Sequence, residues 1–402
     1  MSNKYLSDTK KSSLKRSILS MLYAEGASSI PALAQHTTLS IPSLTEIIQE
    51  LTARKWIRAT GTGSTAGAGR RPRLYSLNPA SYYILVFEID LYFTRIALMN
   101  LEHTIVAETR KEMILKNDPK MIDYLVEEAN KLTEAKKIKH QSLIGIGISL
   151  PGLVNTYEGV PYSYMHFSDN PVIKKIADAF HVPVFIDNDL KTAAYGEHFF
   201  GKARGIRNAF ILSIDVGIGV GLILDGEVFH GKSGFSGELG HIPVKPDGIQ
   251  CYCGKRGCLE TVASIPAIIG RVKQEINAGH DHLKKMIRDK SGTLYIDDII
   301  QSAKAGDETV IDILSETGSE LGRGLANAIH ILNPELIVIG GSIAKAGQFI
   351  SNPVEQSLNK YCMGRIREDV RIELSELGAD LKILGTHVMV MQRLLNENRI
   401  KF

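Results

Sequence analysis

The sequence predicts an α/β protein in which a small helical head precedes a two-lobed body. From about Ser81 onward, short apolar runs of strand length alternate with helical patterns, as in layered α/β folds. This strand-rich pattern starts again near Asn208, which indicates two similar lobes with a cleft between them. A chain of 402 residues is also too long for one compact core.

The composition is that of a soluble globular protein, with 44% apolar and 23% charged residues. No apolar run reaches the roughly 18 residues that a membrane span requires, and the N-terminus lacks the apolar region of a signal peptide. Three of the four cysteines cluster at metal-ligand spacing, which fits a reducing compartment better than a disulfide scaffold. We therefore expect a cytoplasmic protein without a membrane partner.

The head is expected to contain three short helices with the spacing of a helix-turn-helix. The first covers about Ser13–Glu25, the second is capped by Ser29, and the third opens at Pro42. The apolar face of the third helix comprises Leu44, Ile47, Ile48 and Leu51. Its outward side chains, which we predict to contact DNA, are Ser43, Thr45, Glu46 and Gln49.

Two strands, Trp56–Arg58 and Leu74–Leu77, are predicted to follow and to flank the glycine-rich tip Gly61–Gly69. The tip leads into three further candidate DNA contacts, Arg70, Arg71 and Arg73. Such a hairpin is typical of a wing that places cations along a phosphate backbone.

Charge supports this interpretation of residues 1–80 as a winged helix-turn-helix. They contain 11 Lys and Arg against 4 Asp and Glu, whereas the remainder contains 36 against 40. A basic head on a mildly acidic body predicts that the head binds double-stranded DNA. The alternative is a solvated basic loop on a protein-interaction module.

In the first lobe, expected over residues 81–195, the pattern predicts four strands and three helices. The strands are Tyr83–Asp90, Thr94–Met99, Ser142–Ser149 and Val182–Ile186, and the helices are Lys120–Ala135, a segment around Ile173–Phe180 and a segment ending near Phe200. A helix over Thr386–Glu397, within residues 386–402, is expected to close this lobe.

In the second lobe, expected over residues 196–385, a glycine-rich turn over Val216–Gly221 is predicted to join two strands. The predicted strands are Asn208–Asp215, Leu222–Asp225, Leu336–Ile339 and one that contains Glu373. Largely helical residues run from about Ile265 to Leu332.

Four metal-binding residue types occur within eighteen residues of the second lobe: His241, Cys251, Cys253 and Cys258. Three thiolates and one imidazole complete a tetrahedral zinc shell without an open position, which is typical of a structural site. Gly254 and Gly257 supply the turns that such a loop needs. The alternative is a chance cluster of buried thiols. Two flanking acids, Glu238 and Glu260, are not needed by a structural zinc and indicate a polar ligand nearby.

These residues resemble the signature of the ROK family of repressors, open reading frames and sugar kinases. The resemblance rests on Gly237-Glu238-x-Gly240-His241 and on the run from Cys251 to Glu260, with weaker support from Pro151-Gly152, Asn188-Asp189, Asn333-Pro334 and Gly340-Gly341. It implies a two-lobed actin-like ATPase (ribonuclease H-like) fold that holds a sugar in the interlobe cleft. The implied sugar contacts are Gly152, Asn188, Asp189, Glu238, His241 and Glu260.

The phosphate loops separate the kinases of this family from its repressors. Family kinases carry Asp-x-Gly-Gly-Thr, but here Tyr92 and Phe93 occupy the glycine positions and would crowd the phosphates. In the second loop Val216 replaces a hydroxyl residue, and Asp215 adds a negative charge where the triphosphate would lie. We therefore expect no catalytic residue, although Asp189 stands at the position of the kinase general base.

The sequence thus predicts a sugar-responsive transcriptional regulator, most simply a repressor of carbohydrate genes. Its effector would be a sugar or sugar phosphate, and paired heads on two DNA half-sites imply a homodimer or homotetramer. Some family repressors respond instead to a sugar-transport protein, which nothing in the sequence excludes. The alternatives are an ATP-dependent hexose or amino-sugar kinase fused to a DNA-binding head, and a scaffold whose basic head binds a partner protein.

Overall fold

The computed structural model describes residues 8–37, 39–63, 71–167, 172–288, 292–400 and 402. The chain forms two compact units: unit 1 is Met1–Asn188 with Thr386–Phe402, and unit 2 is Asp189–Gly385. The predicted domain limits at residues 80, 195 and 385 describe a finer division, which stays a prediction. Among the described residues, no helix is both long and apolar enough to cross a membrane.

Unit 1 begins with three helices, α1 (Asp8–Glu25), α2 (Ile30–Thr37) and α3 (Ile41–Ala53). As predicted, the Ser29 hydroxyl accepts a hydrogen bond near the start of α2, from the amide of Ala32. Ser40 caps α3, and the predicted apolar face of α3 (Leu44, Ile47, Ile48 and Leu51) is buried. The first helix starts five residues earlier than expected, because its first turn is polar and lacks an apolar period.

A three-stranded sheet of order β1-β3-β2 accompanies these helices. The antiparallel pair β2 (Ile57–Thr62) and β3 (Arg73–Leu77) confirms the predicted hairpin, with a bulge between Ala59 and Gly61. The third strand, β1 (Ser28–Ser29), was missed because two residues carry no periodic signal. Arg70 and most of the predicted hairpin tip lie outside the described residues.

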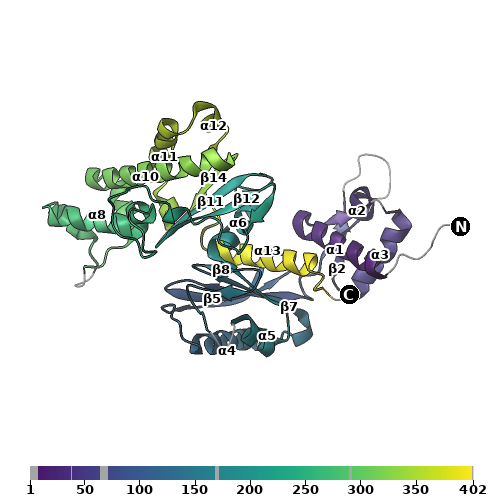
Figure 1. The fold of residues 1–402 in the computed structure, drawn as a ribbon. Coiled ribbons are helices and arrows are strands. Elements are labelled where there is room, and N and C mark those ends of the chain that lie inside the picture. The colour runs from purple at the N-terminus through teal and green to yellow at the C-terminus, as the bar shows by residue number, and fades with distance from the viewer. Residues whose placement is uncertain (1–7, 38, 64–70, 168–171, 289–291, 401) are drawn as a thin grey trace. The chain divides into compact units, whose positions relative to one another are not determined.

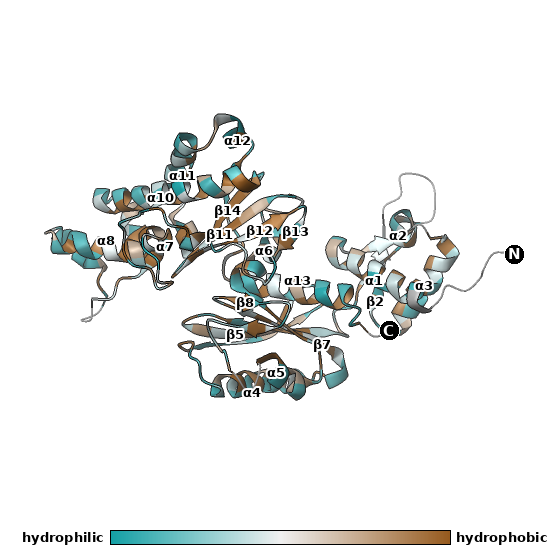
Figure 2. Ribbon diagram, in the orientation of Figure 1, coloured by the Kyte–Doolittle hydropathy of each residue, from teal (hydrophilic) through white to brown (hydrophobic). Residues whose placement is uncertain are grey.

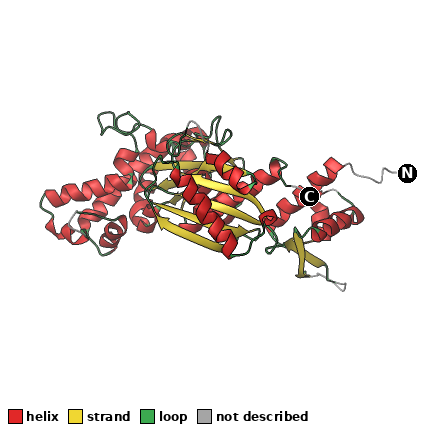
Figure 3. Cartoon of the chain, turned by 90° about the horizontal axis from the view of Figure 1, so that it is seen from below, coloured by secondary structure: helices red, strands yellow, loops and turns green. Residues whose placement is uncertain are grey.

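The second sheet of unit 1 has five strands in the order β10-β7-β4-β5-β6. They are β4 (Tyr83–Ile89), β5 (Phe93–Asn100), β6 (Ile105–Glu112), β7 (Leu143–Leu150) and β10 (Val184–Asn188). Helices α4 (Lys120–Ala135) and α5 (Val172–Phe180) cover one face, and α13 (Leu381–Asn396) lies on the other face (Figure 1). Figure 3 shows helices lying across the strands of a sheet. A short hairpin of β8 (Val154–Asn155) and β9 (Val160–Pro161) follows β7.

The closing helix α13 begins at Leu381, five residues before the predicted start at Thr386. Glycines in β7 let it approach the sheet: a Cβ on Gly147 would lie 2.5 Å from Val390 Cγ2 and 2.6 Å from Thr386 Cγ2. No Cβ atom tolerates such a distance. The residue type at position 147 is thus explained by the packing of a helix encoded more than two hundred residues later.

Unit 2 repeats the topology of the five-stranded sheet in unit 1, which confirms the predicted duplication. Its order is β13-β12-β11-β14-β15, with strands β11 (Ala209–Ile214), β12 (Ile218–Leu224), β13 (Glu227–Phe229), β14 (Leu336–Gly340) and β15 (Arg371–Leu374). In both sheets three consecutive antiparallel strands are extended by two parallel strands on the side of the first. Hydrophobic stretches run through the strands of both units (Figure 2).

The glycine-rich turn predicted over Val216–Gly221 is wrong in extent, because β12 already begins at Ile218. Two of its glycines, Gly219 and Gly221, lie in β12 and serve helix packing. A Cβ on Gly219 would lie 2.1 Å from Leu190 Cδ1, and one on Gly221 would lie 2.5 Å from the Leu190 carbonyl oxygen. Leu190 belongs to α6 (Asp189–Phe200), so these glycines allow α6 to lie close against β12.

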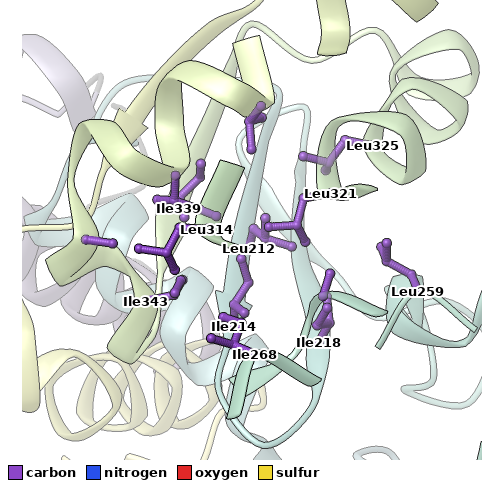
Figure 4. Packing of buried hydrophobic residues seen from close by; sticks show 14 of the residues in the cluster. Leu212, Ile214, Ile218, Leu259, Ile268, Leu314, Leu321, Leu325, Ile339 and Ile343 are labelled. Atoms are coloured by element: carbon purple, nitrogen blue, oxygen red, sulfur yellow. The ribbon is translucent and has the colours of Figure 1, made fainter. Parts of the chain in front are cut away.

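The other helices of unit 2 surround its apolar core. They are α7 (Glu260–Ala263), α8 (Ile265–Asn277), α9 (Ile296–Lys304), α10 (Glu308–Leu332), α11 (Gln348–Tyr361) and α12 (Gly364–Glu368). Figure 4 shows side chains from the strands and these helices packed together, including Leu212, Ile214, Leu321 and Ile339. Leu259, which directly follows the cysteine run, belongs to the same core, so the loop is joined to a rigid base.

Candidate metal centre and ligand-binding residues

The loop Gly237–Glu260 follows β13 in unit 2 and is fastened to the neighbouring strand β12. The amide of Val220 donates to the Gly237 carbonyl at 2.9 Å, and a Cβ at position 237 would lie 1.9 Å from the Val220 carbonyl oxygen. Gly237 also has a φ of 88°, which disfavours other residues. The loop therefore leaves β12 in a conformation that requires glycine.

The loop brings together the four predicted metal ligands. One ligand atom from each of His241, Cys251, Cys253 and Cys258 lies within 4.8 Å of all the others. The Cys253 and Cys258 sulfurs are 3.7 Å apart, and the Cys251 sulfur lies 3.5 Å from His241 Nδ1. A tetrahedron with Zn–S bonds of about 2.3 Å has edges of about 3.8 Å, so the donor set fits zinc.

The two predicted turn glycines are confirmed, because Gly254 has a φ of 88° and Gly257 a φ of 68°. A Cβ on Gly257 would also lie 1.5 Å from the Lys245 carbonyl oxygen. Burial raises the pKa of the Cys251 and Cys258 thiols. A bound dication supplies the positive charge that ionises such thiols.

The two ring nitrogens of His241 face different partners. Nδ1 lies toward the thiols and is 3.5 Å from Glu260 Oε1, whereas Nε2 is 3.0 Å from the Tyr252 hydroxyl and 3.8 Å from Glu238 Oε2. With Nδ1 on a metal, Nε2 carries the proton and donates. Tyr252 was not predicted; its exposed side chain supplies the hydroxyl that lies beside this nitrogen.

Glu260, the first residue of α7, is buried beside the cysteine thiols. The Cys251 thiol donates to Glu260 Oε1 at 2.8 Å. A metal-bound thiolate has no proton to donate, so metal binding would remove this hydrogen bond. The carboxylate is then available to accept from another hydroxyl.

Glu238 lies in an environment where burial raises the pKa of its carboxyl. The charges of His241 and Lys191 oppose this shift, and those of Asp189 and Glu260 reinforce it. Unit 2 thus groups the predicted ligand contacts Asp189, Glu238, His241 and Glu260 within reach of one another's charge.

Two lysines neutralise part of this acidic group. Lys382 Nζ, from the first turn of α13, donates to Asp189 Oδ2 at 2.8 Å. The fully buried Lys191 donates to the Ser236 carbonyl oxygen. Lys382 was not predicted, because the expected helix began only at Thr386 and its partner lies 193 residues away in the sequence.

The remaining two predicted ligand contacts lie in unit 1 and touch each other. Asn188, the last residue of β10, donates from Nδ2 to the Gly152 carbonyl at 2.8 Å. Gly152 has a φ of 83°, and a Cβ there would lie 2.5 Å from Ser163 Cβ. Gly152 and Asn188 stay predicted ligand contacts.

In unit 2, the phosphate-loop position Asp215 binds the protein's own backbone. Its Oδ1 accepts from the Ser342 amide at 2.9 Å, and its Oδ2 accepts from the Ser213 hydroxyl at 3.2 Å. Ser342 follows Gly341, a glycine with a φ of 80° at the end of β14. The carboxylate therefore occupies a backbone amide that could otherwise bind an anion.

The other phosphate-loop positions lie in unit 1. Tyr92 is 55% exposed, and the Arg110 guanidinium lies 3.9 Å from the centre of the Phe93 ring. Aromatic side chains thus occupy both positions where family kinases carry glycine.

Of the predicted DNA contacts that the structure describes, four lie on α3, Arg73 begins β3, and Arg71 lies two residues before it. None of Ser43, Thr45, Glu46 and Gln49 is buried, and Arg71 and Arg73 are exposed. Thr45 donates to the Ile41 carbonyl at 2.7 Å, and Glu46 pairs with Lys11 at 2.9 Å.

The match to a family model agrees with the loop geometry. The model of the ROK family matches residues 91–393, which is most of the chain and includes the complete metal loop. The chain belongs to the ROK family. The two duplicated sheets therefore represent the actin-like fold of ROK proteins.

Relatives of this ROK protein include both repressors and kinases. The xylose repressor of Bacillus subtilis is 28% identical over 366 residues, covering 90% of this chain and 91% of the repressor. The glucokinase of Halalkalibacterium halodurans is 34% identical over 254 residues, covering 62% of this chain and 77% of the kinase.

A solved structure resembles this ROK protein over almost its whole length. It is the crystal structure of a ROK family transcriptional regulator, described as a homologue of the Escherichia coli Mlc protein. The TM-score is 0.83 at 28% identity, and the match covers 97% of this chain and 98% of the regulator. The likeness thus includes the three N-terminal helices as well as the ROK body.

Proposed function

We propose that this protein is a sugar-responsive DNA-binding repressor of carbohydrate genes. The observation that carries the proposal is the extent of its similarity to regulators. The alignment with the xylose repressor spans 366 residues, more than the chain holds after residue 80, so it must include part of the head. The glucokinase alignment is shorter and needs only the body.

In this proposal residues 1–80 form a winged helix-turn-helix. α3 is the recognition helix, with Ser43, Thr45, Glu46 and Gln49 toward base edges. The β2–β3 hairpin is the wing, and Arg71 and Arg73 neutralise phosphates along the DNA backbone. Two such heads in a homodimer or homotetramer would contact two half-sites of an operator.

The effector is a sugar or sugar phosphate whose hydroxyls are held by Asp189, Glu238, His241 and Glu260. Carboxylates accept hydrogen bonds from hydroxyl groups, and His241 Nε2 donates one. Zn²⁺ bound by His241, Cys251, Cys253 and Cys258 would fix the imidazole tautomer and supply no reaction chemistry.

The residues at the phosphate-loop positions and the ion pair of Asp189 argue against ATP-dependent phosphorylation. Asp215 fills a backbone anion site, and Tyr92 and Phe93 replace glycines. Asp189, at the position of the kinase general base, is paired with Lys382, so accepting a proton from a hydroxyl would cost that ion pair. The identity to the glucokinase supports the alternative that this protein is a kinase, and an activity assay decides between the two.

The test selects operator DNA with the full chain from a random duplex library and then measures affinity by fluorescence anisotropy. Titrations with D-glucose, D-xylose, N-acetyl-D-glucosamine and glucose 6-phosphate follow, together with a thermal-shift screen of these sugars. We expect a selected sequence with two half-sites, a steep salt dependence, and one sugar that changes operator affinity. Turnover of any of these sugars with Mg-ATP would instead favour the kinase.

A further inference from the structure

We propose that α13 couples the ligand-binding residues of unit 2 to the DNA-binding head, through Lys382 at its start and His387 one and a half turns later. This inference rests on the proposed function, because it names the route by which the sugar would act on the head. The helix belongs to both units, with its residues up to Gly385 in unit 2 and from Thr386 in unit 1.

The first turn of α13 is attached to α6, the helix that begins with Asp189. Besides the ion pair between Lys382 and Asp189, two glycines bring the helices into contact. A Cβ on Gly385 would lie 1.7 Å from the Thr192 carbonyl oxygen, and one on Gly196 would lie 2.6 Å from the Leu381 carbonyl oxygen. A ligand that draws Asp189 away from Lys382 therefore acts on a helix start that is tightly packed and partly buried.

The next part of α13 is attached to the head. His387 is fully buried, and its Nδ1 lies 2.8 Å from the hydroxyl of Tyr23 in α1. The ring of His103, in the turn between β5 and β6, packs against Tyr23 at 4.4 Å between centroids, and its Nε2 lies 3.3 Å from the Tyr23 carbonyl oxygen. The first head helix is thus joined to α13 by a buried polar contact, which is specific in geometry.

A second contact joins the head to the residues that follow α13. The ring of Phe402 lies 6.1 Å from that of Trp56, and the Lys15 ammonium lies 5.3 Å from the Phe402 ring. Trp56 is the single tryptophan of the chain and stacks on Tyr82 at 4.0 Å. Its fluorescence therefore reports on the head and on its contacts with Tyr82 and Phe402.

These contacts explain what each residue contributes. Lys382 and His387 lie five residues apart on one helix, a rise of about 7.5 Å, with no glycine after Gly385 to interrupt α13. The ligand binds on the side of Asp189, and the response is the arrangement of Tyr23 and α1. Lys382, His387 and Tyr23 are positioning residues, and none is a predicted sugar or DNA contact.

The experiment titrates the full zinc-loaded chain with D-glucose, D-xylose and N-acetyl-D-glucosamine while recording thermal stabilisation and Trp56 emission. In wild type, a sugar that stabilises the protein should also change the emission. Tyr23→Phe should keep the stabilisation but lose most of the emission change. Lys382→Met, which leaves the ligand contact Asp189 without its ion pair, should lose most of the emission change even at sugar concentrations that still stabilise it. The ratio of operator affinities measured with and without the same sugar should fall toward one in both variants.

Two matched variants control for local damage. Tyr75→Phe removes a hydroxyl from β3 of the head, where no hydrogen bond to α13 is present among the described residues. Lys202→Met removes a lysine of unit 2 that pairs with Glu376. Both should keep the wild-type response.

The outcomes separate the two proposals. Stabilisation by none of these sugars would contradict the proposed function and the coupling together. Stabilisation with an unchanged Trp56 response in both Tyr23→Phe and Lys382→Met would overturn the coupling and leave the proposed function standing.

Discussion

The Lys382 ammonium lies 2.8 Å from the Asp189 carboxylate, so the last helix of the chain neutralises the acid at the start of α6. Both side chains are less than one fifth exposed, which limits screening by solvent. Asp189 stands at the position where a kinase of this family would carry its general base. The pair joins the start of α6 to the start of α13.

Removing one thiol should release the metal. In Cys253→Ser the zinc content per chain, measured by a colorimetric chelator after denaturation, should fall from about one to near zero, because a hydroxyl is a weak zinc ligand. Cys362→Ser, which changes a cysteine at the end of α11 outside the cluster, should keep its zinc. Equal zinc content in the two variants would refute the assignment.

Neutralising the predicted wing should weaken DNA binding without changing sequence preference. Arg71→Ala and Arg73→Ala should each lower the slope of log affinity against log salt by about 1, because one phosphate contact is lost. Arg365→Ala, an exposed arginine of α12, serves as the control and should leave the slope unchanged. An unchanged slope in all three variants would place the DNA elsewhere.

The stability of unit 1 should fall in mild acid. Burial lowers the pKa of His387 well below its usual value and also lowers that of His103, while burial of Tyr23 raises the pKa of its phenol. The unfolded chain therefore binds more protons below a pH of about 6.5, and the free energy of unfolding should drop there by up to about 1.4 kcal/mol per pH unit and histidine.

Above that pH both histidines are neutral in the folded and unfolded states, so this contribution should no longer vary. Urea unfolding followed by Trp56 fluorescence between pH 7.5 and 5.5 measures the effect in unit 1. His387→Asn should reduce the slope, and a slope identical to that of wild type would show that other groups dominate.

Adding one methyl group at Gly385 should destabilise the protein although alanine favours helices. Its Cβ would lie 1.7 Å from the Thr192 carbonyl oxygen, so Gly385→Ala should lower the free energy of unfolding by about 1–3 kcal/mol. Gly270→Ala in α8, where nothing lies within 4 Å of the added Cβ, should instead raise it by about 0.5–1 kcal/mol. Urea titrations of both variants distinguish packing from propensity, and stabilisation of both would contradict the close approach of α6 and α13.

Removing the carboxylate at Asp215 should leave the Ser342 amide without an acceptor. Asp215→Ala should therefore lower the free energy of unfolding by about 1–3 kcal/mol in urea titrations. The neighbouring Val216 is exposed, so Val216→Ala should change it by less than about 0.5 kcal/mol. Equal effects of the two substitutions would mean that the Asp215 contacts do not stabilise the turn.

Sequence reasoning worked where the chemistry is local. The metal ligands are close in sequence and of rare residue types, and Leu44, Ile47, Ile48 and Leu51 recur at a helical period, so both groups were predictable. The first part of strand β12 was not, because Gly219 and Gly221 suggest a turn until α6 is known to pack on them. Two-residue strands such as β1 carry no period at all.

Site residues defined by long-range partners escaped for a related reason. Lys382 is an ordinary lysine until Asp189, 193 residues earlier in the chain, is placed beside it. Tyr252 resembles a spacer between two cysteines, and only the ring orientation of His241 gives its hydroxyl a partner. The four metal ligands could be predicted from the sequence. The charges that surround the predicted ligand contacts could be read only from the folded structure.

The glycines of β7 that receive α13 have a consequence for biosynthesis. The ribosome makes β7 early, yet the helix that covers its second face is made only after all of unit 2. Until then the apolar face around Gly145 and Gly147 is exposed, and His387 is not yet present to contact the Tyr23 hydroxyl. A nascent or truncated chain therefore presents an incomplete first unit to chaperones and proteases, and only a chain translated through α13 can assemble the contact between His387 and the head.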